Sequence, residues 1–304
     1  MNSFPTYQSH SPSQPCTSLL WLHSLSPLFR PLSKNILREI NLYLLLPGLL
    51  VAVYDQWLVL YHVNTDDWVR LPRPVDLPRR GFFCFVDVNC VFGFAGDLPR
   101  KEVVAFDVKS YETRRERGMN AARRLPSAVG YGKTVYVFGG WGPEPLEGCE
   151  RKKVDRAEDW TDLPNLPVSG RIHSSTVAGG TIYLSPVFSQ GAIIAFTPSS
   201  DTFRLLPLQS EGNCGVSFTL GSSLWLPSYN HSLELLSLTS QAETRTLEVT
   251  FAQEEVWQMA ACSCTPTLYG QEVIWLSRGV EERLYRFNTN SMLVTTQPIK
   301  KSRL

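Results

Sequence analysis

An aromatic residue recurs at steps of 44, 47, 42 and 50 residues through most of this chain, and that period limits the possible folds more than any other feature. The recurring residues are Phe92, Tyr136, Tyr183, Trp225 and Trp275. Each copy starts with a short strand, a turn and a second strand that holds the aromatic residue. A variable loop, a third strand, a polar turn and a fourth strand follow. Four strands per step of this size are typical of β-propeller blades.

A second spacing agrees with the first. In four successive copies a polar residue stands 12 positions before the aromatic residue. These polar residues are Arg80, Arg124, Arg171 and Asn213. Six periods fit between residues 49 and 297. The sequence therefore predicts an all-β fold, a six-bladed β-propeller of four-stranded blades over residues 47–299.

Three stretches of the chain resemble kelch repeats. The stretch Tyr136-Val-Phe-Gly139-Gly140 is similar to the second strand of a kelch repeat, which ends in a Gly pair. The stretches 171–175 and 64–72 fit the start and the end of such a repeat, although most copies here lack the Gly pair. The likeness covers about residues 49 to 297. It implies a non-enzymatic scaffold or adaptor that binds another protein through loops around a central channel.

The N-terminal part lies outside the repeats. Residues 1–31 are rich in Ser and Pro and predict a disordered arm. Residues 32–46 have apolar residues at helical spacing and predict a short amphipathic helix. Residues 42–63 approach the length of a membrane span, but Pro47 and Gly48 interrupt them. We therefore expect strands there and no membrane partner, with residues 42–46 as one candidate for the inner strand that the first copy lacks.

The repeat predicts a binding surface at one end of the propeller. It brings Arg80, Arg124 and Arg171 to equivalent positions around one mouth of the channel. Arginine recognises carboxylates and phosphates with a planar fork, which favours an acidic or phosphorylated peptide as the partner. Alternatively, these arginines brace loops by bonding backbone carbonyls. The loops 96–101, 141–148 and 228–231 should rise at the same end and bring Trp141, Tyr229 and His231 to it.

Charge gives no support to a nucleic-acid partner. The chain has 29 Lys and Arg against 28 Asp and Glu, a net charge of +1. Residues 100–124 are locally basic, with the highest density at 114–117. We place that density on the outermost strand of the second blade and the loop after it, where charge deters edge-to-edge pairing. Aromatic residues interleaved with the basic ones, which single-stranded nucleic acid requires, are nearly absent there.

No pattern of catalytic or cofactor-binding residues occurs. The five His residues lie in different repeats, and the seven Cys residues include no CxxC pair, so we expect no metal, cofactor or disulfide framework. We expect a monomer in the cytoplasm, where thiols stay reduced. Two alternatives remain: a propeller enzyme with a site at the channel mouth, and an adaptor of a ubiquitin ligase. The second rests on Leu32–Leu44, which is similar to the first helix of an F-box.

Overall fold

All regular elements in the described part of the chain are β-strands, 23 in number. The computed structural model describes residues 49–298 except for gaps at 54–56, 64–65, 78–81, 86–89, 95–97, 108–109, 111, 145, 155–157, 169–171, 187–191, 208–217, 221–222, 228–231, 238–243, 249–266, 270–271, 277–282, 289 and 292. These strands all fall within one compact unit, Tyr43–Leu304.

The described strands form six antiparallel sheets, each built from consecutive strands in chain order. The first sheet has three strands: β1 (Leu49–Val53), β2 (Trp57–His62) and β3 (Asp67–Pro72). The second has β4 (Phe82–Phe85), β5 (Cys90–Phe94), β6 (Val103–Asp107) and β7 (Glu112–Glu116). The third has β8 (Ser127–Tyr131), β9 (Thr134–Phe138), β10 (Cys149–Lys153) and β11 (Thr161–Leu163).

The remaining three sheets have four strands each. The fourth has β12 (Ile172–Ala178), β13 (Thr181–Pro186), β14 (Ala192–Thr197) and β15 (Thr202–Pro207). The fifth has β16 (Phe218–Leu220), β17 (Ser223–Pro227), β18 (Ser232–Ser237) and β19 (Thr244–Glu248). The sixth has β20 (Thr267–Tyr269), β21 (Glu272–Leu276), β22 (Arg283–Asn288) and β23 (Leu293–Pro298). Several four-stranded antiparallel sheets in succession are consistent with a propeller.

The aromatic residues that define the repeat occupy the predicted strand. Phe92, Tyr136, Tyr183, Trp225 and Trp275 lie in β5, β9, β13, β17 and β21, the second strand of each four-stranded sheet. The predicted Gly turns are also present. Gly132 and Lys133 have φ of 57° and 57° between β8 and β9, and a two-residue hairpin with positive φ at both positions matches the twist of its strands.

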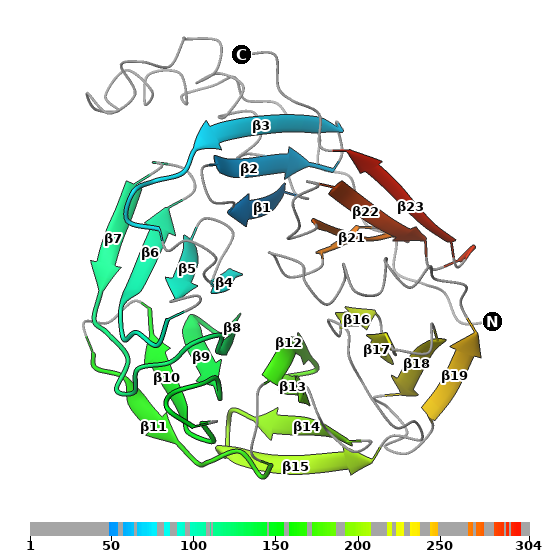
Figure 1. Ribbon diagram of the computed structural model, residues 1–304. Coiled ribbons are helices and arrows are strands. Elements are labelled where there is room, and N and C mark those ends of the chain that lie inside the picture. Colours follow the sequence, from blue (N-terminus) through cyan, green and yellow to red (C-terminus); the bar gives the residue numbers. More distant parts are fainter. Residues whose placement is uncertain are drawn as a thin grey trace, which may run out of the picture. The chain divides into compact units, whose positions relative to one another are not determined.

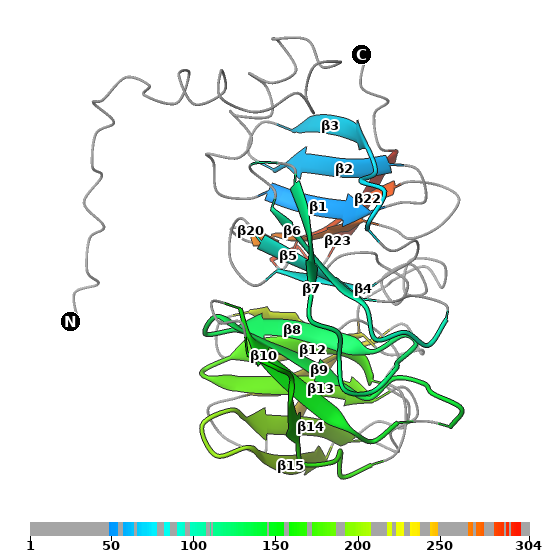
Figure 2. The same ribbon diagram turned by 90° about the vertical axis from the view of Figure 1, so that its left-hand side faces the viewer.

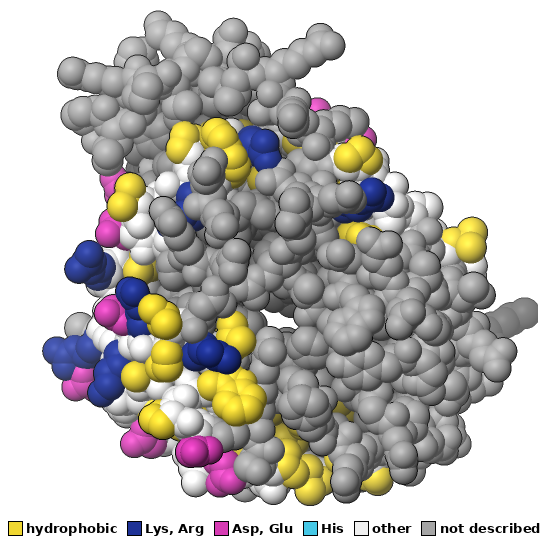
Figure 3. Space-filling model, viewed as in Figure 1, with side chains coloured by type: hydrophobic (Ala, Val, Ile, Leu, Met, Phe, Trp, Pro, Cys, Tyr) yellow, Lys and Arg dark blue, Asp and Glu magenta, His cyan; other side chains and the backbone are white. Residues whose placement is uncertain are grey.

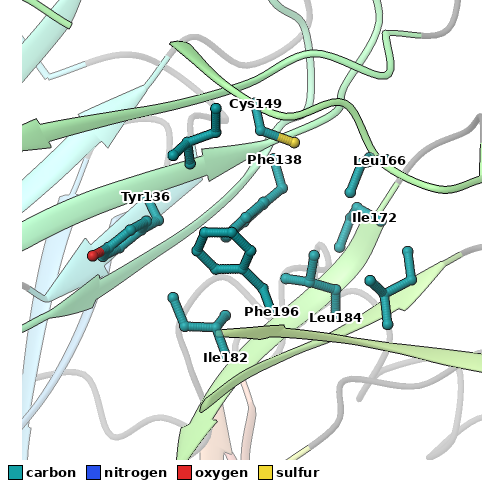
Figure 4. Close-up of a cluster of buried hydrophobic side chains, with 10 residues drawn as sticks. Tyr136, Phe138, Cys149, Leu166, Ile172, Ile182, Leu184 and Phe196 are labelled. Carbon is teal, nitrogen blue, oxygen red and sulfur yellow. The ribbon is translucent and has the colours of Figure 1, made fainter. Parts of the chain in front are cut away.

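Contacts between sheets follow the chain order. In Figure 1 the second to fifth sheets run from an inner first strand to an outer fourth strand, and β4 contacts β8, β8 contacts β12 and β12 contacts β16. Apolar side chains fill the space between neighbouring sheets. Figure 4 shows one such cluster, between the third and fourth sheets. There the Phe196 ring of β14 lies 5.6 Å from Phe138 and 5.9 Å from Tyr136, both of β9.

Two predictions for the N-terminal part lie outside the described residues: the arm over 1–31 and the helix over 32–46. The described residues of the segment 42–63 form strands β1 and β2, as expected. The first sheet has three described strands in place of four, and residues 42–46, the candidate inner strand, are also outside the described part. The described residues contain no helix of the length and apolarity that a bilayer span requires.

Removing an aromatic side chain that packs between two sheets should destabilise the folded protein. Phe196→Ala should lower the free energy of unfolding by about 3–5 kcal/mol, because the fully buried ring leaves a cavity between two sheets. Urea denaturation measures this loss. Leu205→Ala on β15 is the control, since its side chain is 45% exposed and should cost little. Equal losses in the two variants would contradict this account of the packing.

Candidate interaction surface

The predicted binding surface can be followed at one end of the third sheet. Ser127 and Cys149 both pair with Phe138, so the segment before β8 and the loop after β9 meet at the same end of this sheet. Two of the predicted site residues, Arg124 and Trp141, are described there. The other four, Arg80, Arg171, Tyr229 and His231, lie outside the described residues.

Arg124 and Trp141 are held together by their backbones. The Arg124 N–H donates to the Trp141 carbonyl at 2.7 Å, and the Trp141 N–H donates back to the Arg124 carbonyl at 2.8 Å. Gly140 makes this approach possible. Its φ is +99°, and a Cβ at this position would lie 2.9 Å from the Arg124 carbonyl oxygen, closer than a side chain tolerates. The Gly pair of the repeat thus brings the two predicted residues side by side.

The loop 139–148 that carries Trp141 is ordered by its own hydrogen bonds. The Leu146 N–H donates to the Gly140 carbonyl at 2.9 Å, and the Gly142 N–H donates to the Glu144 carbonyl at 2.9 Å. Trp141 is half-buried and Arg124 is exposed. Among the described residues the Arg124 guanidinium has neither a hydrogen-bond nor an ion-pair partner. The backbone of Arg124 is therefore fixed, while the N–H groups of its guanidinium are available to a ligand.

The neighbouring Arg123 has the opposite environment. Its side chain is 1% exposed and lies between the connection from the second sheet and the loop 139–148. One guanidinium nitrogen, Nη1, donates to the carbonyls of Gly139 at 2.8 Å and Gly148 at 2.5 Å, which are the two ends of that loop. Nη2 donates to Glu150 Oε1 at 2.6 Å. Arg123 therefore braces the loop that carries Trp141.

Glu150 of β10 completes this buried cluster. It is 1% exposed, and besides Arg123 it accepts the backbone N–H groups of Asn120 at 2.6 Å and Ala121 at 3.0 Å. The segment 120–124 is thus tied to the third sheet by side-chain and backbone bonds. The sequence reasoning did not find this pair. The available signal was alternation, because successive residues of an extended segment face opposite ways, so one of Arg123 and Arg124 should point inward.

The cluster of basic residues at 114–117 lies largely on the predicted outermost strand of the second sheet. The strand β7 is the outermost strand of the second sheet, and it faces the viewer in Figure 2. Its charged side chains are largely paired, Arg114 with Glu116 at 2.6 Å and Arg115 with Asp76 at 3.6 Å. Solvation of an edge strand accounts for the charges of this strand.

The described buried cysteines are core residues. Burial raises the pKa of the Cys149 thiol to about 11, and burial likewise raises the pKa of Cys84. Both thiols therefore stay protonated near neutral pH. In the part of the chain that the structure describes, no three His, Cys, Asp or Glu side chains gather to hold a metal ion.

Breaking the buried ion pair should be costly. Arg123→Met should lower the free energy of unfolding by about 3–5 kcal/mol, because it leaves the Glu150 carboxylate buried without its cation. The double variant Arg123→Met/Glu150→Gln should lose less, since Gln is neutral and still accepts a backbone N–H. Urea denaturation of both variants checks this. A double variant less stable than the single one would contradict the role of the charge.

Comparison with known proteins gives limited similarity. No family model matches the chain. One stretch of 96 residues is 28% identical to a protein of Arabidopsis thaliana whose name describes it as an F-box/kelch-repeat protein. The match spans 32% of this chain and 26% of that protein. The similarity, together with the succession of antiparallel sheets, fits a kelch-like β-propeller.

Proposed function

We propose that this chain is a non-enzymatic protein-interaction module that binds its partner at the loop end containing Arg124 and Trp141. The observation that supports this most directly is the exposed Arg124, whose guanidinium has no partner among the described residues and whose backbone is fixed by two hydrogen bonds beside a half-buried Trp141. Similarity to a kelch-repeat protein supports an interaction role in general. Arg80, Arg171, Tyr229 and His231 are proposed as further contacts, on the strength of the repeat alone.

The two residues suit recognition of an acidic segment. A guanidinium can form two parallel hydrogen bonds to a carboxylate or phosphate, and its planar fork loses less freedom per bond than an ammonium does. A partly exposed tryptophan beside it offers a large apolar contact with few rotatable bonds. The brace from Arg123 keeps the loop in one conformation before binding, which lowers the entropic cost of association.

Affinity capture followed by titration of the captured partner tests this proposal. Arg124→Ala and Trp141→Ala should each weaken partner binding by about tenfold or more, and Arg124→Ala should also reduce its salt dependence. Lys153→Ala is the matched control, because Lys153 pairs with Thr134 at the opposite end of the same sheet. Partner binding that survives both site variants unchanged would refute the proposed surface.

We also propose that the six sheets close into a six-bladed ring. Supporting contacts join the sixth sheet to the first. Asp66, after β2, accepts hydrogen bonds from Arg286 of β22 at 3.3 Å and Gln297 of β23 at 3.2 Å. The Arg286 guanidinium also bonds the Tyr61 hydroxyl and lies 5.7 Å from the centre of its ring. In a closed ring these polar contacts would hold the sixth sheet to the first.

Ring closure predicts that stability depends on the last sheet. A chain that ends before Trp257 should show no cooperative thermal transition. In the full chain, Arg286→Met should lower the melting temperature by several degrees, since it removes the cation shared by Tyr61 and Asp66. Leu293→Ala on β23, 64% exposed, is the control and should change little. A sharply melting truncated chain would argue against closure.

A second candidate function is that of a ubiquitin-ligase adaptor. It is favoured by the F-box in the name of the similar Arabidopsis protein and by the likeness of Leu32–Leu44 to an F-box helix. Affinity capture with the full chain and with Leu37→Asp/Ile40→Asp tests it. Ubiquitin-ligase subunits should be recovered with the first and lost with the second. Their absence from both would exclude this function.

A further inference from the structure

A cavity of about 500 Å³ opens on the outer side of the second sheet, beside the connection from the first sheet. The start of β6, the end of β7, the segments next to them and Asp76 of the connection after β3 line it, and its charged lining residues are Asp76, Arg100, Lys101, Glu102, Arg115 and Glu116. In Figure 3, Lys and Arg side chains gather on the side where Figure 1 places β7 and β10, with Asp and Glu between them. We call this cavity the β6–β7 groove.

Two of the three carboxylates in the β6–β7 groove are already matched by cations. Asp76 pairs with Arg115 at 3.6 Å and accepts a hydrogen bond from Thr113 at 3.2 Å. Glu116 pairs with Arg114 at 2.6 Å and lies 3.9 Å from the ammonium of Lys152. Their negative charge is therefore largely neutralised within the protein.

Two cationic side chains of the groove have no ion-pair partner among the described residues. Arg100 and Lys101 are exposed, and within the described part of the chain their side chains have no hydrogen-bond or ion-pair partner. Glu102 is the one lining carboxylate that is likewise exposed and has no described hydrogen-bond or ion-pair partner. The groove thus offers two available cations against one available anion, and its chemistry favours a ligand with excess negative charge.

The backbone that carries these cations is fixed. Arg100 and Arg123 exchange two backbone hydrogen bonds of 3.0 Å each, and the Met119 N–H donates to the Lys101 carbonyl at 2.8 Å. Gly118 allows this approach, since a Cβ there would lie 3.0 Å from the Lys101 carbonyl oxygen. The groove is therefore joined through Arg123 to the buried ion pair and does not depend on Arg100 or Lys101 side chains for its shape.

Two exposed aliphatic residues are close in sequence to residues that line the groove. Val75 precedes the lining residue Asp76 and is 91% exposed, and Leu98 lies two residues before Arg100 and is 60% exposed. Large aliphatic side chains in such positions gain free energy when a partner covers them. Neither side chain lines the groove itself, so an aliphatic residue of the partner would add to binding only where the bound segment extends past the groove.

We propose that the β6–β7 groove is a second docking site, which binds an extended acidic segment of a partner protein that also carries an aliphatic residue. This site goes beyond the proposed function, because it uses Arg100 and Lys101 and neither Arg124 nor Trp141. A protein segment fits better than nucleic acid, because the described lining of the groove has no aromatic side chain on which a base could stack.

Peptide selection on the full chain tests the proposal. A phage library of random 12-residue peptides is selected on the immobilised protein, and the enriched peptides are synthesised and titrated by fluorescence polarisation. The expected peptides are rich in Asp and Glu with an aliphatic residue. Arg100→Glu/Lys101→Glu should weaken their binding at least tenfold, and Glu102→Gln should strengthen it about threefold by removing the unmatched carboxylate. Lys153→Glu, at the far end of the third sheet, should leave binding unchanged.

The variants separate this site from the one in the proposed function. Arg124→Ala and Trp141→Ala should change binding of these peptides less than twofold. If binding instead falls with those two variants and survives Arg100→Glu/Lys101→Glu, the groove proposal is wrong and the first surface gains support. Enrichment of peptides without acidic residues, or of none, also overturns it. The proposal is also overturned if a 12-nucleotide single-stranded DNA binds tightly and this binding requires Arg100 and Lys101.

Discussion

The buried ion pair between Arg123 and Glu150 ties together the surfaces on which both proposed sites lie. A guanidinium and a carboxylate in a water-free position are stable only when all their bonding groups are matched, and here loop carbonyls and backbone N–H groups match them. The pair fixes the connection between the second and third sheets. Arg100 bonds to that connection on one side and Trp141 on the other.

The second constraint is the apolar packing between sheets. A sheet of three or four short strands cannot bury both faces alone, so each must pack against a neighbour. Rings such as Phe138 and Phe196 fill the space between the third and fourth sheets, and Trp160 and Phe94 do so between the second and third. Phe94, Phe138 and Phe196 belong to strands, whereas Trp160 precedes β11, so the connecting segments also contribute to this packing.

Sequence reasoning located the strands well and the environments of individual side chains less well. The aromatic period placed five markers in the correct strands, because a buried strand demands an apolar residue at a regular interval. It also brought Arg124 and Trp141 to one end of a sheet, since antiparallel strands fix which loops meet. It selected Arg124 and passed over Arg123, because the period counts positions along the chain and does not report which of two adjacent arginines faces inward.

Reading the chain alone was enough to predict the all-β class, the order of the strands, the Gly turns and the edge position of the basic strand β7. These follow from local patterns: alternation, turn residues and repeated spacing. Which charged side chains have a partner depends instead on how the sheets pack. Arg123 and Glu150 are 27 positions apart, and Arg115 and Asp76 are 39 apart. No local pattern predicts pairs so far apart in the sequence, because these pairs form only when separate sheets pack. The same packing leaves Arg100, Lys101 and Arg124 as cations without a described partner.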